Sequence, residues 1–218
     1  PIKNKPVLIN GVLFCPSSTE KTGWKAHIEY TADWGHTWTK SADLNDNKII
    51  EAIQPSILQY KDGRMQIICR SRNTTLNESW SSDGGKTWSA MTASPLPNNN
   101  SGTDAVTLKD GSQLLVYNHL LPDSTWKNGK GPRTPLNVAV TKDGKTWYAA
   151  LVLEDSPISQ YSYPSVIQTK DGLVHVVYTW RREKIKHVTI DPKKLKLKKI
   201  INKQWPGGQK PAGKTSDD

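Results

Sequence analysis

Residues 81–88 read SSDGGKTW, and two other stretches repeat this order of Ser or Thr, Asp, Gly, Thr and Trp. Residues 31–38 read TADWGHTW, and residues 141–147 read TKDGKTW, with one residue fewer between Asp and Trp. In such a motif the Asp accepts hydrogen bonds from the backbone amides of its own turn, the Gly adopts a positive φ, and the Trp packs between neighbouring sheets. All three roles are structural, so we interpret the motif aspartates as turn residues rather than catalytic groups.

A hairpin signal, Asn-Gly or Asp-Gly between two apolar stretches, precedes each motif, and a fourth hairpin has no motif after it. The four signals lie 52, 48 and 61 residues apart, at Asn10-Gly11, Asp62-Gly63, Asp110-Gly111 and Asp171-Gly172. Each unit therefore reads strand, tight turn, strand, loop, strand, motif, strand. Four strands in about 50 residues is the size of one propeller blade, and self-similarity at this period indicates a repeat architecture.

Composition agrees with an all-β fold. Val, Ile, Thr, Tyr and Trp are frequent, helical periodicity is nearly absent, and no apolar run approaches the roughly 20 residues of a membrane span. The first residues, PIKNKPVLIN, already read as strand and show no secretory leader, so we expect the natural chain to begin earlier. Cys15 and Cys69 lie in apolar strand patterns without metal-ligand spacing, so we expect buried thiols rather than a disulfide.

The formal net charge is +10, and half of this excess lies in the terminal segment. Residues 191–218 hold eight Lys and three Asp, and they read as a last strand followed by a basic tail rich in Pro, Gly and Lys. We therefore separate a repeat region, residues 1–190, from this segment. A basic chain suggests a nucleic-acid partner, but no groove-reading motif accompanies the charge, so we do not expect the protein to bind nucleic acid.

The motifs and hairpins resemble those of the Asp-box, or bacterial neuraminidase repeat, propellers, whose best-known members are sialidases. The resemblance covers residues 1–190 and implies an all-β, sialidase-type β-propeller. This chain would supply about three to four C-terminal blades of a six-bladed propeller. Because other glycosidases and non-enzymatic proteins share the box, the motif indicates the fold more directly than the reaction.

Residues between the boxes extend the resemblance. A sialidase blade has a carboxylate about eight residues before a hairpin Asp-Gly and an arginine eight residues after it, and Gln54 and Arg70 lie at those distances from Asp62. A later family arginine corresponds to Arg133 in GPRTPLNVAVTKDGKTW. The last blade has a tyrosine before its hairpin, and QYSYPSVIQTKDG offers Tyr161 and Tyr163 there.

The chemistry of sialic acid explains these residue types. Its anomeric carbon bears a carboxylate that would repel an attacking carboxylate, so a tyrosine deprotonated by a Glu serves as nucleophile. Arginines hold the substrate carboxylate by bidentate hydrogen bonds. The resemblance thus implies Arg70 and Arg133 as carboxylate ligands and Tyr163, eight residues before Asp171, as nucleophile. Gln54 departs from the pattern, because an amide cannot accept the tyrosine proton. The family's first arginine and its acid/base aspartate would precede residue 1.

Other residues could supply the missing groups, although each could equally be a solvated or packed side chain. Asp104 begins an inner strand, where Ser101 and Gly102 would let a ligand approach the backbone. A His beside carboxylates can act as acid or base near neutral pH. In HIEY, residues 27–30, strand alternation places His27 and Glu29 on the same face. The further candidates around the site are Glu20, His27, Glu29, Arg72, Asn118 and His119.

Three functions follow from these residues. The first is a sialidase-like exo-glycoside hydrolase acting on a terminal acidic sugar of glycans, and the resemblance implies a secreted or periplasmic protein. The second is a non-catalytic carbohydrate-binding propeller, which Gln54 favours. The third is a hydrolase or lyase of another acidic sugar, such as a uronic acid. No cofactor is implied, and the sequence does not define an oligomeric state. A carboxylate pocket requires Arg70, Arg133 and the Tyr163 hydroxyl within about 10 Å, a length two or three side chains jointly span.

Overall fold

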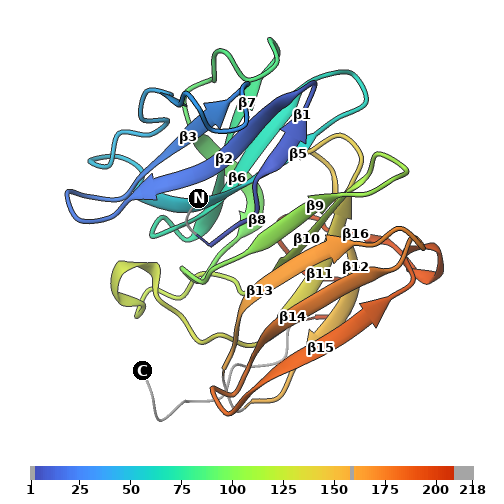
Figure 1. Ribbon diagram of the computed structural model, residues 1–218. Coiled ribbons are helices and arrows are strands. Elements are labelled where there is room, and N and C mark those ends of the chain that lie inside the picture. The colour runs from blue at the N-terminus through green and yellow to red at the C-terminus, as the bar shows by residue number, and fades with distance from the viewer. Residues whose placement is uncertain (1–2, 158–159, 209–218) are drawn as a thin grey trace.

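The computed structural model describes residues 3–157 and 160–208, and four antiparallel sheets follow one another along the chain (Figure 1). The first sheet consists of β1 (Val7–Ile9), β2 (Val12–Thr19), β3 (Lys25–Thr31) and β4 (Thr39–Lys40). The second consists of β5 (Ala52–Gln59), β6 (Met65–Ser71), β7 (Thr75–Ser81) and β8 (Thr92–Pro97). In each, neighbours in sequence are neighbours in the sheet.

The third sheet consists of β9 (Asp104–Thr107), β10 (Gln113–Tyr117), β11 (Leu136–Thr141) and β12 (Trp147–Glu154). The fourth has three strands, β13 (Tyr161–Gln168), β14 (Val174–Trp180) and β15 (Lys184–Ile190). Short 3-10 helices lie at η1 (Lys127–Gly129) and η2 (Pro192–Lys194). The strand expected near the end of the chain is β16 (Lys198–Lys199), which pairs with β12 and so adds a fifth strand to the third sheet.

These sheets confirm the predicted all-β propeller, with each sheet as one blade. Every blade begins at a predicted hairpin, and the four hairpin glycines adopt φ values of 81° to 89° that favour glycine in these turns. The first strand of each blade therefore runs toward its hairpin turn, and the starts of β5, β9 and β13 lie together at the other end. Contacts of β9 with both β5 and β13 bring these inner strands together.

The Asp-box turns have the predicted hydrogen bonds. Asp83 accepts from the Ser81 hydroxyl at 2.8 Å, the Thr87 amide at 2.9 Å and the Thr87 hydroxyl at 2.6 Å. These bonds, the hydroxyl of Thr87 first, lower the pKa of Asp83 to about 2. Asp33 has the same set of bonds, and Asp143 accepts from the amides of residues 145 and 146.

The motif tryptophans differ from one another. Trp147 is buried between the second and third blades, and Trp88 packs against the cluster between the first and second. Trp38 is 53% exposed, so its predicted packing between sheets is wrong. Its ring lies over Gly35 of its own turn, and its indole N–H donates to the Gly35 carbonyl at 3.1 Å.

Apolar clusters fill the three interfaces between successive blades. Cys15 and Cys69 are buried free thiols, as predicted. The outer face of the fourth blade exposes Ile167, Val177 and Ile185, the kind of face that a neighbouring sheet covers in a closed propeller. Within the described residues, no helix has the length and apolar character needed to cross a membrane.

Candidate functional site

Two residues at the starts of inner strands have the same unusual backbone. Gln54 has φ 56° and Tyr163 has φ 51°, and each is followed by a proline. In both strands the pairing register shifts at this point, between Ile53 and Ser56 and between Ser162 and Ser165. Left-handed non-glycine residues cost about 1–3 kcal/mol and cluster at functional sites, and a bulge re-aims a side chain. The second and fourth blades thus use one device to turn a side chain out of the strand.

Glycine allows these two side chains to meet. A Cβ on Gly102, ahead of β9, would lie 3.1 Å from Cδ1 of Tyr163 and 3.4 Å from Oε1 of Gln54. Both side chains therefore pack over Gly102 from either side. A side chain at this position would push them apart.

Arg70 and Arg133 converge on the hydroxyl of Tyr163, and both guanidinium groups lie close enough to lower its pKa. The Arg133 guanidinium carbon also lies 5.1 Å from the centre of the Tyr163 ring. Burial alone would raise the pKa of Tyr163, but the charges of Arg133 and Arg70 outweigh it, and the pKa is lowered below its ordinary value. Tyr163 is 45% exposed, so a ligand can reach this group of side chains. The convergence expected from the sequence is present.

Arg70 is held by a residue that the sequence analysis missed. Its Nε and Nη2 donate to Oδ1 of Asn100 at 3.2 and 3.0 Å, and Nη2 also donates to the Asn100 carbonyl at 2.7 Å. Its Nη1 donates to Oε1 of Gln54 at 3.4 Å, and its guanidinium carbon lies 5.1 Å from the Trp24 ring centre. Burial lowers the pKa of Arg70, and the charges of Tyr163 and Glu20 oppose that effect. Asn100 adopts φ 58°, a conformation that Asn tolerates better than most residues, so its residue type is the only sequence signal for this position.

Comparison with known proteins assigns this architecture. A family model described as a BNR repeat-like domain matches residues 1–176. The chain belongs to the BNR repeat-like family. A search of curated proteins by sequence gave no match.

Solved structures similar to this BNR repeat-like chain include several sialidases. The NanB sialidase of Streptococcus pneumoniae, in a mutant form, has a TM-score of 0.64 at 17% identity, over 88% of this chain and 31% of that one. The intramolecular trans-sialidase of Ruminococcus gnavus has a TM-score of 0.62 at 19% identity, over 86% and 42%. A Dyadobacter fermentans protein of unknown function has a TM-score of 0.61 at 20% identity, over 79% of this chain and 47% of that one. At these identities the likeness shows the fold, and this chain spans less than half of each of these proteins.

Asp104 is buried in an ion pair and does not contact the arginine cluster, so its catalytic role stays a prediction. It is 2% exposed and forms an ion pair with Lys5 at 2.9 Å. Its two oxygens also accept the amides of Ala105 and Val166 at 2.9 and 2.8 Å. With the Ser56 hydroxyl at 3.2 Å, Asp104 joins the inner strands of three blades and has a structural role.

Three further residues predicted to contact substrate have buried side chains, and their role in binding stays a prediction. Tyr161 is 1% exposed in the cluster between the third and fourth blades. Asn118 donates to the carbonyls of Pro135 and Tyr161. His119 accepts from or donates to the Tyr117 hydroxyl at 2.5 Å and contacts the Lys203 carbonyl at 2.9 Å, so it fastens the terminal segment to the third blade.

The remaining candidates divide between the site and its surroundings. Glu20 acts electrostatically on Arg70. Arg72 donates to Glu51 at 2.7 Å and lies 4.1 Å from the Trp24 ring centre, so it packs beside the cluster. His27 and Glu29 contact each other at 3.3 Å on one face of β3, as alternation predicted, but they pair with each other rather than with the arginines. In the described part of the chain, no group of three or more His, Cys, Asp or Glu side chains is arranged to hold a metal ion.

Proposed function

We propose that this chain is part of a sialidase-like exo-glycoside hydrolase that acts on a terminal acidic sugar of glycans, sialic acid or a relative. The supporting observation is the convergence of Arg70 and Arg133 on the hydroxyl of Tyr163. Two guanidinium groups beside one exposed phenol form a cationic cluster, and a sugar carboxylate is an anion that arginine binds in bidentate fashion. We further propose that the protein works outside the cytoplasm, secreted or in a periplasm.

In this proposal Arg70 and Arg133 bind the carboxylate and bring the anomeric carbon over Tyr163. The phenol oxygen forms a bond to that carbon as the glycosidic bond breaks, and water later cleaves the glycosyl-tyrosine bond. Lowering the pKa of Tyr163 through two arginines favours the phenolate, which partly offsets the absence of a Glu at Gln54. The leaving oxygen needs a proton, and the carboxyl group of Glu20, in its protonated form, is our candidate donor because it lies close enough to act on Arg70.

Hydrolysis of a fluorogenic α-sialoside by the full-length protein tests the proposal. Tyr163→Phe should reduce kcat by at least about 100-fold while the affinity for a sialic acid analogue changes little, because only the nucleophile is lost. Tyr161→Phe is the matched control, since it removes a buried hydroxyl from the same strand. Wild-type turnover in Tyr163→Phe, or no turnover by the wild-type protein, would contradict the hydrolase.

Gln54 favours a second candidate, a propeller that binds acidic sugars without cleaving them. Its amide lies beside Arg70 where the family has a base, and it cannot take a proton from tyrosine. Calorimetric titration with sialic acid and with glucuronic acid distinguishes the candidates. Binding of either sugar that requires Arg70 and Arg133, without turnover of its glycosides, would favour the binding protein. Turnover of a glucuronide alone would redirect the activity to uronic acids.

A further inference from the structure

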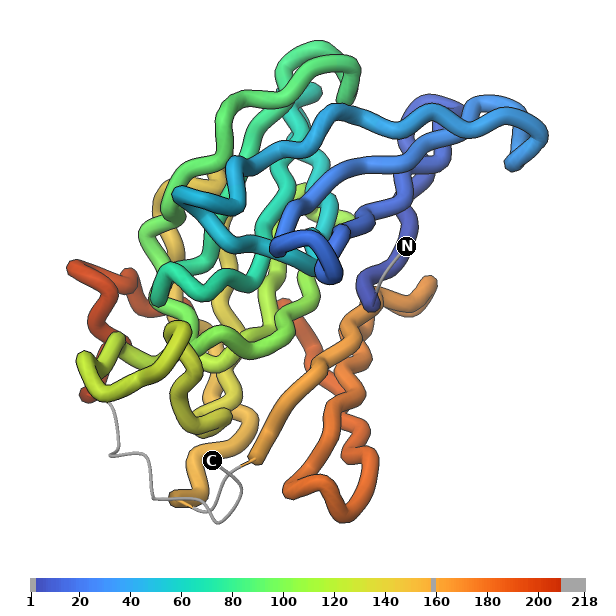
Figure 2. The backbone as a smooth tube through the Cα atoms, turned by 90° about the vertical axis from the view of Figure 1, so that its left-hand side faces the viewer, coloured from blue at the N-terminus to red at the C-terminus, as the bar shows by residue number. Residues whose placement is uncertain are grey.

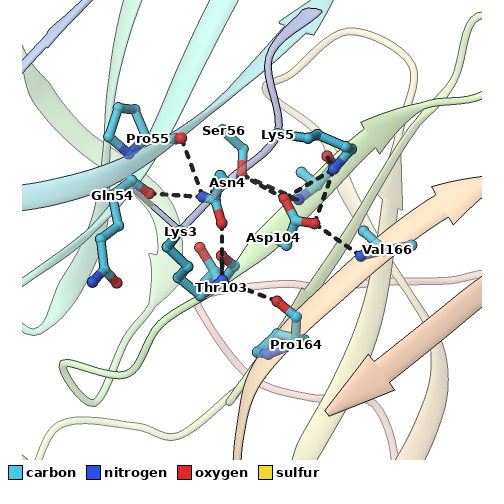
Figure 3. Close-up of polar contacts among 11 residues, drawn as sticks. Lys3, Asn4, Lys5, Gln54, Pro55, Ser56, Thr103, Asp104, Pro164 and Val166 are labelled. Carbon is cyan, nitrogen blue, oxygen red and sulfur yellow. Dashed lines mark hydrogen bonds and ion pairs between the residues drawn. The ribbon is translucent and has the colours of Figure 1, made fainter. Parts of the chain in front are cut away.

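The segment Lys3–Lys5, which precedes the first blade, runs between the inner strands of the second, third and fourth blades. In Figure 2 it lies, in dark blue, between the first blade and the fourth blade in orange. Figure 3 shows its side chains directed into the region where the starts of β5, β9 and β13 meet. None of these residues was a candidate from the sequence, yet they contact residues about 50, 100 and 160 positions away.

The bulges that turn out Gln54 and Tyr163 also leave backbone carbonyls outside the strand pairing. Residues 54 and 55 have no partner in the β5–β6 register, and residues 163 and 164 have none in the β13–β14 register. Buried carbonyls without donors are costly, so other groups must satisfy them. The side chains of Lys3 and Asn4 perform this role.

Asn4 satisfies the bulge of the second blade. Its Nδ2 lies 2.9 Å from the Gln54 carbonyl, 3.1 Å from the Pro55 carbonyl and 2.9 Å from the Ser56 hydroxyl. Asn4 is buried, with 4% of its surface exposed. Its amide group therefore fixes the peptide units on both sides of Pro55.

Lys3 satisfies the bulge of the fourth blade and couples it to the second. Its Nζ donates to the Pro164 carbonyl at 2.9 Å, the Thr103 carbonyl at 2.6 Å and Oδ1 of Asn4 at 2.9 Å. All three ammonium protons are thus used. Lys3 itself has φ 71°, and its Cε would lie 3.0 Å from a Cβ on Gly102, the same point that Gln54 and Tyr163 approach.

We propose that Lys3 and Asn4 are positioning residues that hold the bulges of Gln54 and Tyr163, so that both side chains meet Arg70. This inference deepens the proposed function and rests on it for the meaning of the site, but the geometry can be tested without any substrate. Losing the Lys3 ammonium frees the carbonyl next to Tyr163. The phenol then moves relative to the two guanidinium groups that set its ionisation.

The ammonium of Lys3 is also sensitive to alkaline pH. The pKa of Lys3 is lowered to about 8, chiefly by burial; the charge of Asp104 opposes this effect, and the charges of Lys5 and Arg70 add to it. Above that pH the amine retains two protons for three acceptors. The hydrogen bonds of the Lys3 side chain therefore weaken as the pH rises above about 8. An arginine at this position would keep its charge in that pH range.

The test uses full-length protein containing tyrosine labelled with 13C at Cζ. Tyr163→Phe identifies the Tyr163 resonance, and its pH titration is then compared in wild type, Lys3→Met and Lys109→Met. Lys109 is the matched control, because its Nζ donates to the Lys170 carbonyl and joins the third and fourth blades at their hairpin end. We expect the Tyr163 midpoint to rise by about one pH unit in Lys3→Met and to stay unchanged in Lys109→Met. An unchanged midpoint in folded Lys3→Met would overturn the proposal.

Gly102→Ala provides a second route if Lys3→Met does not fold. The added methyl group would crowd Lys3, Tyr163 and Gln54 at 3.0 to 3.4 Å, and Gly102 has no positive φ to make alanine unfavourable. We expect its Tyr163 midpoint to shift as well, and where Lys3→Met does not fold, an unshifted midpoint in Gly102→Ala would overturn the proposal. Where the wild-type protein cleaves a sialoside, Lys3→Met should lower kcat about 10-fold, and Lys3→Arg should restore part of it. A wild-type protein without turnover contradicts the proposed function alone, because the Tyr163 titration still reports positioning.

Discussion

Replacing Asp104 with asparagine should destabilise the protein by about 3 kcal/mol, because no orientation of the amide fits the site. Oδ1 of Asp104 accepts the Ala105 amide and Oδ2 accepts the Val166 amide. Either rotamer of the introduced carboxamide would point its NH2 group at a backbone N–H. A buried donor left without an acceptor costs about 1–3 kcal/mol, and a hydrogen bond to a charged group contributes about 1.5–3 kcal/mol. Lys5 is 28% exposed in its side chain and can regain water, so we do not add the full cost of a broken buried ion pair.

Thermal unfolding followed by circular dichroism measures this effect. For a chain of this size about 3 kcal/mol corresponds to a fall in Tm of about 6–12 °C. Asp43→Asn is the control, since Asp43 pairs with Lys25 at 3.0 Å on the surface, where such pairs contribute at most about 1 kcal/mol. The reasoning is refuted if Asp104→Asn lowers Tm no more than Asp43→Asn does.

Three further predictions concern the site and the terminal segment. Gln54→Glu places a carboxylate beside Tyr163 and should raise sialoside kcat roughly 10-fold or more, as a general base does; an unchanged kcat contradicts a tyrosine nucleophile limited by its base. Arg133→Met should raise the pKa of Tyr163, measured by its 13C titration, because one of the two charges that lower it is lost; an unchanged midpoint contradicts the assigned electrostatics. Burial lowers the pKa of His119 to about 4 against an ordinary 6.5, so the unfolded state binds the proton first. Stability is therefore complete above about pH 6.5 and should fall by about 3 kcal/mol as the pH drops to about 4. Urea unfolding at several pH values measures this dependence, and His119→Gln should make the free energy of unfolding depend less on pH. An equally steep dependence in the variant would contradict the role assigned to His119.

The repeat architecture could be predicted because its signals are local. An Asx-Gly pair between apolar stretches favours a tight turn, and the bonds around Asp83 close within seven residues. Arg70, Arg133 and Tyr163 could be selected because each has a fixed distance from such a turn or box. Their convergence needed only the assumption that successive blades surround one axis.

Burial within the candidate site could not be predicted, since a bulge changes strand alternation. Tyr161 and Tyr163 are two residues apart, and alternation places them on the same face. The register shift between Ser162 and Ser165 breaks this rule, so Tyr161 enters the core while Tyr163 is exposed. The side chains of Asn118 and His119 contact the fourth blade and the terminal segment, respectively, and local sequence patterns do not contain such contacts.

Gln54 and Arg70 come from the second blade and Tyr163 from the fourth, so the geometry of the site depends on how the blades pack against one another. Asp104 and Lys3 both join the third blade to the fourth, one through the Val166 amide and the other through the Pro164 carbonyl. These two contacts lie on either side of Ser165, immediately beyond Tyr163. Weakening these contacts between the inner strands should therefore disturb Tyr163 before the blades separate. In Asp104→Asn, the Tyr163 titration should change at temperatures well below the unfolding transition, whereas in Asp43→Asn it should match the wild type up to that transition.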